Sequence, residues 1–250
     1  MIKPKKILEL LDYKLLNVFC NNEYRRFIVL SRSRTGSNLL ISLLNSHPHI
    51  NATGEIFSRL NGRDYKKILS KVYSKKPRFV KASGFKIFYY HPLDDHSCGI
   101  WDELHSMNDL YVIHLKRKNI LRTLISRKIA ADQDVWIVKP DQNPLSYKKQ
   151  FCVNFTVEEL KKGFRQTKNW EDSGENQFSN HPLLSIYYED LASDRSTTFR
   201  KITNFLGVQY VQPKTDMKKQ NQKCIRDTLA NYENLKSKFA ETEWASFFED

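Results

Sequence analysis

A predicted strand that runs through a polar loop into a helix is the feature that most constrains this chain. Residues 27–30 are continuously apolar (Phe-Ile-Val-Leu) and follow charged residues, which is typical of an interior strand of a parallel sheet. The polar loop 31–38 comes next. Leucines then recur at helical spacing over residues 39–44, and Pro48 predicts the end of that helix. The chain therefore predicts strand, loop and helix in direct succession.

The same order returns further along the chain. Residues 110–115 predict a second strand, and the apolar face of a predicted helix follows Asn119, which is a favourable N-cap residue. Further strands are predicted at residues 84–88 and 183–188. Strands that alternate with helices predict an α/β fold with a central, mostly parallel sheet flanked by helices, and ligands bind such sheets at the carboxyl ends of the strands. A length of 250 residues suits one domain of this kind.

Residues 132–181 follow a looser pattern than the rest of the chain. Pro140, Pro144, Gly163 and Gly174 lie there among scattered aromatic residues. We interpret the segment as an insertion over the ligand site that shapes a second pocket or closes as a lid.

The charge balance indicates an anionic partner. Lys and Arg number 41 and Asp and Glu 28, which gives a formal net charge of +13. Solubility alone would also account for this charge, and the chain carries neither a basic aromatic stripe nor a helix-turn-helix signature, so a nucleic-acid partner is disfavoured. Four scattered cysteines, no signal-peptide core and no long apolar run predict a cytoplasmic protein without a transmembrane segment. His47 and His49 lack further ligands at metal-binding spacing, so no metal is expected.

The loop 31–38 has the chemistry of an anion site. A loop that leaves a strand and enters a helix presents unpaired backbone N–H groups, and the helix dipole adds partial positive charge. Gly36 lets the backbone approach a ligand closely. Short donors and positive charge come from Arg32, Arg34, Thr35, Ser37 and Asn38.

The loop is not a phosphate-binding loop of the nucleoside triphosphatase kind. Gly36 stands alone, and no lysine follows it to reach terminal phosphates. A nucleotide or sugar kinase is the alternative interpretation, but it should carry a lysine-serine loop and magnesium-binding carboxylates.

The run from Arg34 to Asn38 (Arg-Thr-Gly-Ser-Asn) resembles the 5′-phosphosulfate loop of sulfotransferases that use 3′-phosphoadenosine 5′-phosphosulfate (PAPS). Asn38 departs mildly from the serine or threonine that is usual at the last position. Arg117 and Ser126, nine residues apart, resemble the 3′-phosphate site of the same family, especially in its bacterial carbohydrate-type members.

Three further features extend the resemblance. In many relatives the arginine and serine of the 3′-phosphate site are one residue closer together in the sequence than Arg117 and Ser126. Lys116 and Arg122 are therefore alternative candidates for contacts with this phosphate. The block at residues 187–191 (Tyr-Tyr-Glu-Asp-Leu) is common in the superfamily, and Tyr188 is either an adenine contact or a core tyrosine. In the basic tail, Lys219 is a candidate phosphate contact.

The resemblance implies a P-loop-like three-layer fold and transfer of a sulfuryl group from PAPS to the hydroxyl of a glycan, glycolipid or other small molecule, with adenosine 3′,5′-bisphosphate (PAP) as product. Glu55 corresponds to the general base of carbohydrate sulfotransferases, and His47 competes for that role. Arg34 is expected at the bridging oxygen, where negative charge develops. Lys86 either assists at the sulfuryl group or is a lysine whose stem alone is buried.

Overall fold

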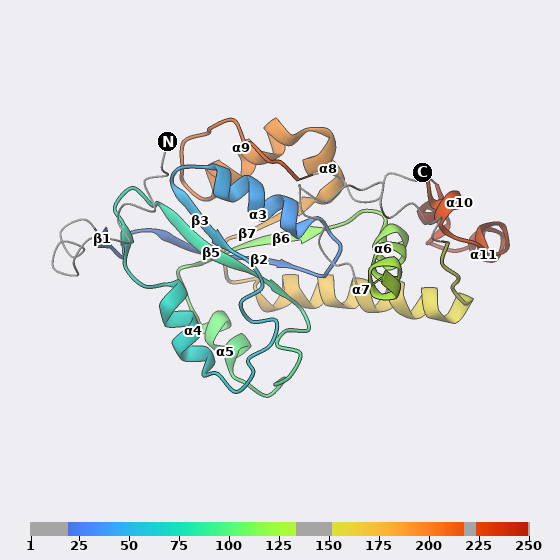
Figure 1. Ribbon diagram of the computed structural model, residues 1–250, viewed down its shortest axis with the longest axis horizontal. Helices are drawn as coiled ribbons and strands as arrows, with labels where there is room; N and C mark the ends of the chain where they lie inside the picture. Colours follow the sequence, from blue (N-terminus) through green and yellow to red (C-terminus); the bar gives the residue numbers. More distant parts are fainter. Residues whose placement is uncertain (1–19, 134–151, 218–223, 250) are drawn as a thin grey trace.

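A five-stranded parallel sheet with the strand order β3-β5-β2-β6-β7 lies at the centre of the computed structural model, which describes residues 20–133, 152–217 and 224–249. The order confirms the expected α/β fold with a parallel sheet (Figure 1). The strands are β2 (Arg25–Ser31), β3 (Ile50–Thr53), β5 (Ala82–Phe88), β6 (Leu110–Lys116) and β7 (Leu183–Tyr187). A short antiparallel pair, β1 (Cys20–Asn21) and β4 (Lys76–Pro77), stands apart from this sheet.

Successive residues of β2 point to opposite faces of the sheet, and each face is covered by helices. Phe27 and Val29 pack in one buried cluster, while Ile28 and Leu30 pack in another. Helices α3 (Ser37–Ser46), α8 (Tyr188–Ser193) and α9 (Arg195–Phe205) cover the first face. The second face carries α4 (Tyr65–Val72), α5 (Ile100–Ser106) and α7 (Val157–Gln177), as Figure 1 shows. This is the expected three-layer arrangement, and burial on both faces explains why the strand is continuously apolar.

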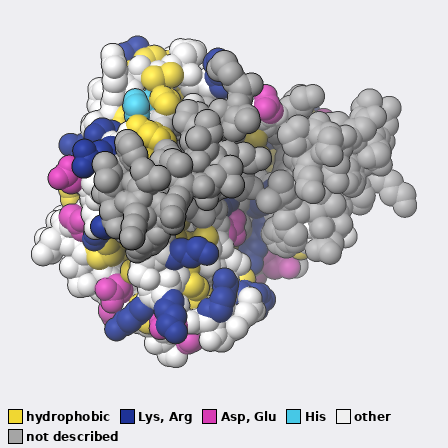
Figure 2. Space-filling view, turned by 60° about the vertical axis from the view of Figure 1, so that its left-hand side comes forward, with side chains coloured by type: hydrophobic (Ala, Val, Ile, Leu, Met, Phe, Trp, Pro, Cys, Tyr) yellow, Lys and Arg dark blue, Asp and Glu magenta, His cyan; other side chains and the backbone are white. Residues whose placement is uncertain are grey.

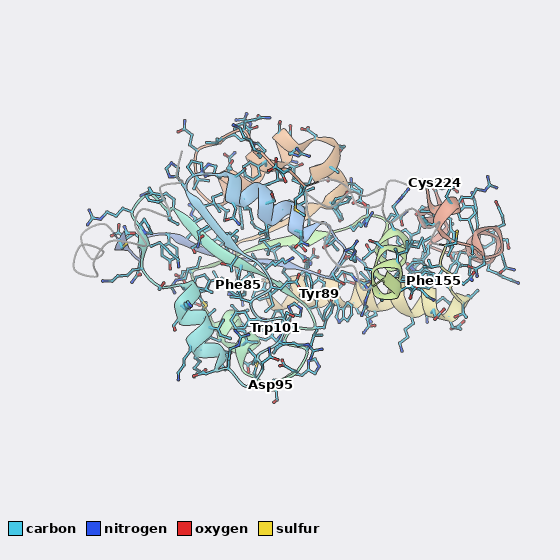
Figure 3. The ribbon with its side chains drawn as sticks, viewed as in Figure 1. Phe85, Tyr89, Asp95, Trp101, Phe155 and Cys224 are labelled. Carbon is cyan, nitrogen blue, oxygen red and sulfur yellow. The ribbon has the colours of Figure 1, made fainter. Side chains whose placement is uncertain are left out.

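A third buried cluster lies beside the sheet and joins distant parts of the chain. It contains side chains of α6 (Ile120–Gln133), the first half of α7, α10 (Ile225–Thr228), α11 (Tyr232–Phe239) and the 3-10 helix η2 (Ala245–Phe248). Figure 3 places Phe155 and Cys224 in this region, away from Phe85 and Trp101 on the second face of the sheet. The cluster fixes α6 and α10 at the end of the molecule where β6 runs into α6.

Helix α7 differs from the expected insertion at residues 132–181. Residues 157–177 form a regular helix of the second layer, and a capping box starts it: Glu159 donates its backbone N–H to Thr156 Oγ1, and Thr156 donates its own to Glu159 Oε2. The buried stripe consists of Leu160, Phe164, Thr167, Glu171 and Gly174. Because three of these five residues are not apolar, a search for hydrophobic periodicity misses the helix. Residues 134–151 of the expected insertion lie outside the described residues.

The two glycines of α7 are points of close approach rather than helix breakers. A Cβ atom on Gly163 would lie 2.7 Å from a methyl carbon of Leu124, and one on Gly174 would lie 2.9 Å from a methyl carbon of Leu30. Glycine therefore lets α7 lie directly against α6 and the sheet.

Candidate functional site

The five parallel strands deliver polar side chains to one edge of the sheet. The carboxyl end of each strand supplies at least one: Glu55 after β3, Lys86 within β5, the loop 32–36 after β2, Arg117 after β6 and Tyr188 after β7. Because the strands are parallel, these positions share one edge. The order of the strands thus brings residues between positions 32 and 188 of the sequence together in one region.

The start of α3 is open to an anion. Gly36 at its N-cap has φ +82°, no side chain of the described residues caps the helix, and its first turn contains no acidic residue. The ring of Tyr188 lies so close to Gly36 that a Cβ there would be 2.3 Å from the tyrosine Cδ2 atom. Gly36 is therefore required both by its left-handed backbone and by the approach of this ring. The open N–H groups and the helix dipole favour a negative ligand.

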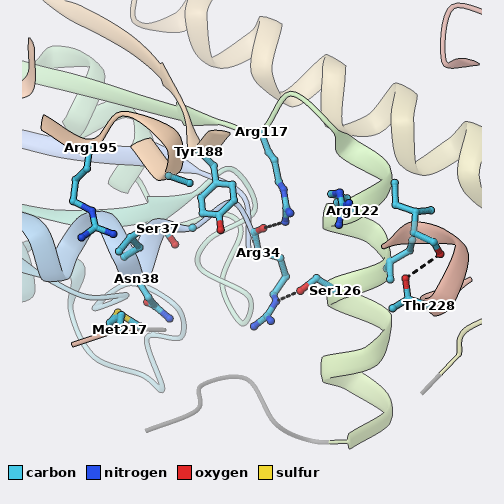
Figure 4. Close-up of a pocket in the computed structure, with 15 residues that line it drawn as sticks. Arg34, Ser37, Asn38, Arg117, Arg122, Ser126, Tyr188, Arg195, Met217 and Thr228 are labelled. Carbon is cyan, nitrogen blue, oxygen red and sulfur yellow. Dashed lines mark hydrogen bonds between the residues drawn. The ribbon is translucent and has the colours of Figure 1, made fainter. Parts of the chain in front are cut away.

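Arg34 and Arg117 converge beside this helix start. Arg34, which has φ +68°, donates from Nε to Ser126 Oγ at 2.8 Å, and Arg117 donates to the backbone carbonyl of Arg34 at 3.1 Å (Figure 4). The Arg117 guanidinium also lies 4.9 Å from the centre of the Tyr188 ring. Burial lowers the pKa of both arginines, and their mutual repulsion adds to the effect at Arg34. An anion between them would offset both costs.

A cavity of about 280 Å³ opens between α3, α6, α8 and α10. It brings together most of the residues expected to bind the nucleotide, namely Arg34, Gly36, Ser37, Asn38, Arg117, Ser126 and Tyr188. Arg122, one of the two alternative candidates for the 3′-phosphate site, lines the cavity too. The sequence pattern therefore identified one wall from the β2–α3 junction and a second from the β6–α6 junction.

Arg32 and Thr35 do not line this cavity. Arg32 is 2% exposed, donates to Thr167 Oγ1 and lies over the Trp170 ring at 5.6 Å. Its burial lowers its pKa to about 10. Thr35 donates to the Arg32 carbonyl at 2.8 Å, so both residues hold the loop against α7 and the sheet.

Two further candidate residues, Lys116 and Lys219, are not among the described residues that line the cavity. Lys116, the second alternative candidate for the 3′-phosphate site, forms a 2.6 Å ion pair with Glu175 of α7. Lys219 lies outside the described residues.

Arg195 is a cavity residue that the sequence pattern did not reveal. It is the first residue of α9 and lines the same cavity as Arg117, on the side where Figure 4 shows Ser37. The Nε atom of Arg195 is buried without a hydrogen-bond acceptor in the described part of the chain, and that of Arg117 is buried 3.6 Å from Glu189 Oε1, beyond hydrogen-bond distance. Buried donors of this kind require an acceptor, which a phosphate can supply. In the sequence, the only feature that marks Arg195 is its position directly after the capping residue Asp194, and arginines at such positions are common on protein surfaces.

A second group of charged residues adjoins the same helix start. Lys86 is 3% exposed, donates to Asn38 Oδ1, lies 3.5 Å from Ser37 Oγ and pairs with Glu55 Oε1 at 2.8 Å. Burial lowers the pKa of Lys86, while the charge of Glu55 opposes that effect. The structure therefore joins Glu55, 34% exposed, to the anion-binding loop through one lysine.

His47 lies in a different setting. It is 1% exposed, its Nε2 atom is 2.8 Å from the Gln209 carbonyl, and its Nδ1 atom accepts from the backbone N–H of His49. Both ring nitrogens are therefore occupied by backbone groups, and neither is placed to receive a proton from an acceptor.

On the face of the molecule that Figure 2 shows, Lys and Arg side chains lie among acidic and hydrophobic ones rather than forming one basic surface. Within residues 20–133, 152–217 and 224–249, no group of three or more His, Cys, Asp or Glu side chains is placed to hold a metal. None of the described helices is both long and apolar enough to cross a bilayer.

Comparison with known proteins identifies the family. No protein-family model matches the chain. Nodulation protein H of Rhizobium tropici is 30% identical over 243 residues, which cover 89% of this chain and 92% of that protein. Nodulation protein H of Rhizobium meliloti is 25% identical over 246 residues, covering 90% and 95%.

The crystal structure of a sulfotransferase from Alicyclobacillus acidocaldarius has the same fold, with a TM-score of 0.51, 15% identity and coverage of 86% of this chain and 90% of that one. Together with the identity to Nodulation protein H over nearly the full length of both chains, this fold and this site establish that the chain belongs to the PAPS-dependent sulfotransferase family.

Proposed function

We propose that this sulfotransferase moves a sulfuryl group from PAPS to a hydroxyl of a carbohydrate or glycolipid acceptor, with Glu55 as general base. The observation that carries the proposal is the contact of Lys86 with both Glu55 and the start of α3. It places a carboxylate beside the loop that lines the nucleotide cavity. The carbohydrate class of acceptor follows the resemblance of the chain to carbohydrate-type members.

The cavity residues fit PAPS in their chemistry. PAPS carries a 3′-phosphate and a 5′-phosphosulfate, and the cavity offers guanidinium groups, hydroxyls, the start of α3 and the buried Nε donor of Arg195, which has no acceptor among the described residues. Arg117 and Ser126 are proposed to bind the 3′-phosphate, and Ser37 and Asn38 the 5′-phosphate. Tyr188 and Arg195 complete the wall. Lys219, outside the described residues, remains a proposed phosphate contact.

Three residues have separate proposed roles in the reaction. Glu55 accepts the proton of the acceptor hydroxyl. At the same time the oxygen of that hydroxyl forms a bond to sulfur, and the bond between sulfur and the 5′-phosphate breaks. Arg34 stabilises the negative charge that develops on the leaving phosphate. Lys86 neutralises charge on the sulfuryl oxygens and orients Glu55. Glu55 then releases the proton to solvent, so the reaction yields PAP and the sulfated acceptor.

Transfer of labelled sulfate from PAPS across a library of acceptors tests this function. Glu55→Gln should lower turnover by about 10²–10⁴-fold, the usual contribution of a general base, with little change in PAP affinity. Arg34→Ala should lower turnover and also weaken PAP binding. Glu241→Gln, at an exposed carboxylate, is the control. Full turnover by Glu55→Gln would refute the assignment of the base, and sulfation of non-saccharide hydroxyls alone would refute the acceptor class.

A further inference from the structure

The two oxygens of the Glu55 carboxylate face different partners. Lys86 Nζ lies 2.8 Å from Oε1, and His91 Nε2 lies 4.0 Å from Oε2. Both partners come from one segment of chain, because Lys86 is in β5 and His91 follows the end of that strand at Phe88. His91 belongs to none of the sequence patterns that identified the site.

Packing and hydrogen bonds fix the His91 ring. The residue is 3% exposed, and its ring lies against Phe88 and Tyr90 at centroid distances of 4.8 and 5.5 Å. Its backbone N–H donates to the Phe88 carbonyl at 2.9 Å, and its own carbonyl accepts from Trp101 Nε1 at 2.8 Å. The ring therefore has little freedom to turn away from Glu55.

The hydrogen bond to Nδ1 determines where the ring carries its proton. The backbone N–H of Phe88 donates to His91 Nδ1 at 3.3 Å, so this nitrogen is the acceptor. Burial lowers the pKa of His91 to about 4, with Glu55 opposing the effect and Lys86 adding to it. A neutral ring whose Nδ1 accepts must carry its proton on Nε2, the atom that faces Glu55. In this state neither nitrogen can take a proton from an acceptor hydroxyl.

We propose that His91 is a positioning residue for Glu55: its Nε2–H holds Oε2 while Lys86 holds Oε1, so that the carboxylate is fixed in one orientation toward the acceptor hydroxyl. This inference rests on the proposed role of Glu55 as base. The 4.0 Å separation closes to a hydrogen bond by rotation of the Glu55 side chain, as catalytic hydrogen bonds often tighten once substrate is bound. Each carboxylate oxygen keeps a second lone pair, so both donors can be in place while the base accepts a proton.

Two substitutions of His91 distinguish the effect of its N–H donor from the effect of its aromatic ring. His91→Phe keeps an aromatic ring but removes the Nε2–H, and His91→Gln restores an N–H donor near the position of Nε2. We expect His91→Phe to lower kcat about 10- to 100-fold, because loss of orientation of a reacting group has effects of this size. KM for PAPS and the dissociation constant of PAP should change less than about twofold, while His91→Gln should recover most of the kcat.

The pH profile of kcat provides a readout that packing alone does not move. The charged or titratable groups that face Glu55 in the described structure are Lys86 and His91, and those that face His91 are Glu55, Lys86 and the Tyr90 ring. A donor to a carboxylate favours the ionised form. Its loss in His91→Phe should therefore shift the acid limb of the profile to higher pH, and His91→Gln should shift it back. Equal losses in both variants with an unmoved acid limb would overturn the proposal in favour of a packing role.

A double-mutant cycle distinguishes this proposal from that of the base. If His91 acts through Glu55, His91→Phe should have little further effect on kcat in a Glu55→Gln background. A full additional loss in that background would show that His91 acts independently and would overturn its positioning role. Full activity of Glu55→Gln alone would instead refute the base. Melting temperature and PAP binding, measured on each variant, confirm that the fold and the donor site are intact.

Discussion

Single residues with an unusual backbone conformation or deep burial define the cavity beside the start of α3. Gly36 and Arg34 both have positive φ, although only one of them is a glycine. A non-glycine residue in this region is uncommon and costs free energy that surrounding contacts must offset. The hydrogen bond from Arg34 to Ser126 and the one from Arg117 to the Arg34 carbonyl are such contacts. Backbone geometry thus selects which arginine of the loop reaches the cavity.

We expect Gly36→Ala to weaken PAP binding by more than about tenfold, since a methyl group there meets the Tyr188 ring at 2.3 Å and displaces it from the cavity wall. Isothermal titration with PAP measures the effect. Gly62→Ala is the matched control, because Gly62 also has positive φ, +74°, but a Cβ there would meet nothing within 4 Å. Equal affinities of the two variants would show that the approach of Tyr188 does not matter for binding.

Arg195 gives a prediction that separates binding from turnover. Arg195→Ala should weaken PAP binding by about tenfold or more, because hydrogen bonds to charged groups contribute on this scale. The kcat at saturating PAPS should stay close to the parent value, since no role in the reacting centre is proposed for Arg195. Lys201→Ala removes a positive charge from the exposed side of the same helix and should change neither quantity. A comparable loss of affinity in Lys201→Ala would indicate a general charge effect instead.

At the scale of elements, α7 is where the sequence pattern and the fold disagree most. Its buried stripe includes Thr167, Glu171 and Gly174, because the helix covers the polar anchor of Arg32 and packs closely on the sheet. Such a stripe has no hydrophobic periodicity to detect. The strand β3 also escaped prediction, since four residues directly after Pro48 and His49 carry too little pattern.

Glu171 makes the stability of this layer depend on pH. Burial raises its pKa to about 7, with Lys116 as the largest opposing influence, and the residue is 8% exposed. The native state then holds the proton more tightly than the unfolded chain, in which the carboxyl has its ordinary pKa of 4.5. Burial of this carboxyl therefore costs little stability below about pH 4.5, progressively more as the pH rises toward 7, and its full amount above 7.

We accordingly expect Glu171→Gln to raise the melting temperature relative to the parent protein at pH 8, with a smaller difference at pH 5. Differential scanning calorimetry at matched ionic strength measures the two differences. Glu158→Gln, on the same helix with its side chain 83% exposed, should show no such trend. A difference for Glu171→Gln that is constant across this pH range would contradict the assignment of the raised pKa.

At the scale of the whole molecule, residues of α3, α6, α8 and α10 line the proposed nucleotide cavity, so ligand binding should stabilise the fold as a unit. At 100 times its dissociation constant, a ligand stabilises the native state by about 2.7 kcal/mol. We expect PAP to raise the melting temperature by roughly 5–10 °C, given the entropy of unfolding of a chain of this size. ATP, which lacks the 3′-phosphate, and a single-stranded oligonucleotide should give much smaller shifts at equal concentration. A shift with the oligonucleotide that equals the shift with PAP would refute the specificity of the cavity.

The sequence by itself determined the local units of this protein. The strand, the loop with Gly36 and the helix that follows are encoded by neighbouring residues, as are the Asn119 cap, whose side chain accepts from the Arg122 N–H at 3.1 Å, and the second junction at Arg117. Each rests on hydrophobic period or capping chemistry that acts over a few residues. For that reason the parallel sheet and most of the cavity wall were predictable.

Only the tertiary structure decided which of these units meet. Glu55, Lys86 and His91 come together because β3 pairs with β5, and strand order is set by packing rather than by any local pattern. Arg195 reaches the cavity because α8 and α9 pack on the same face of the sheet as α3. Arg32 and Arg34 are chemically alike and two positions apart, yet burial against α7 takes one away from the cavity while the backbone of the other turns toward Ser126.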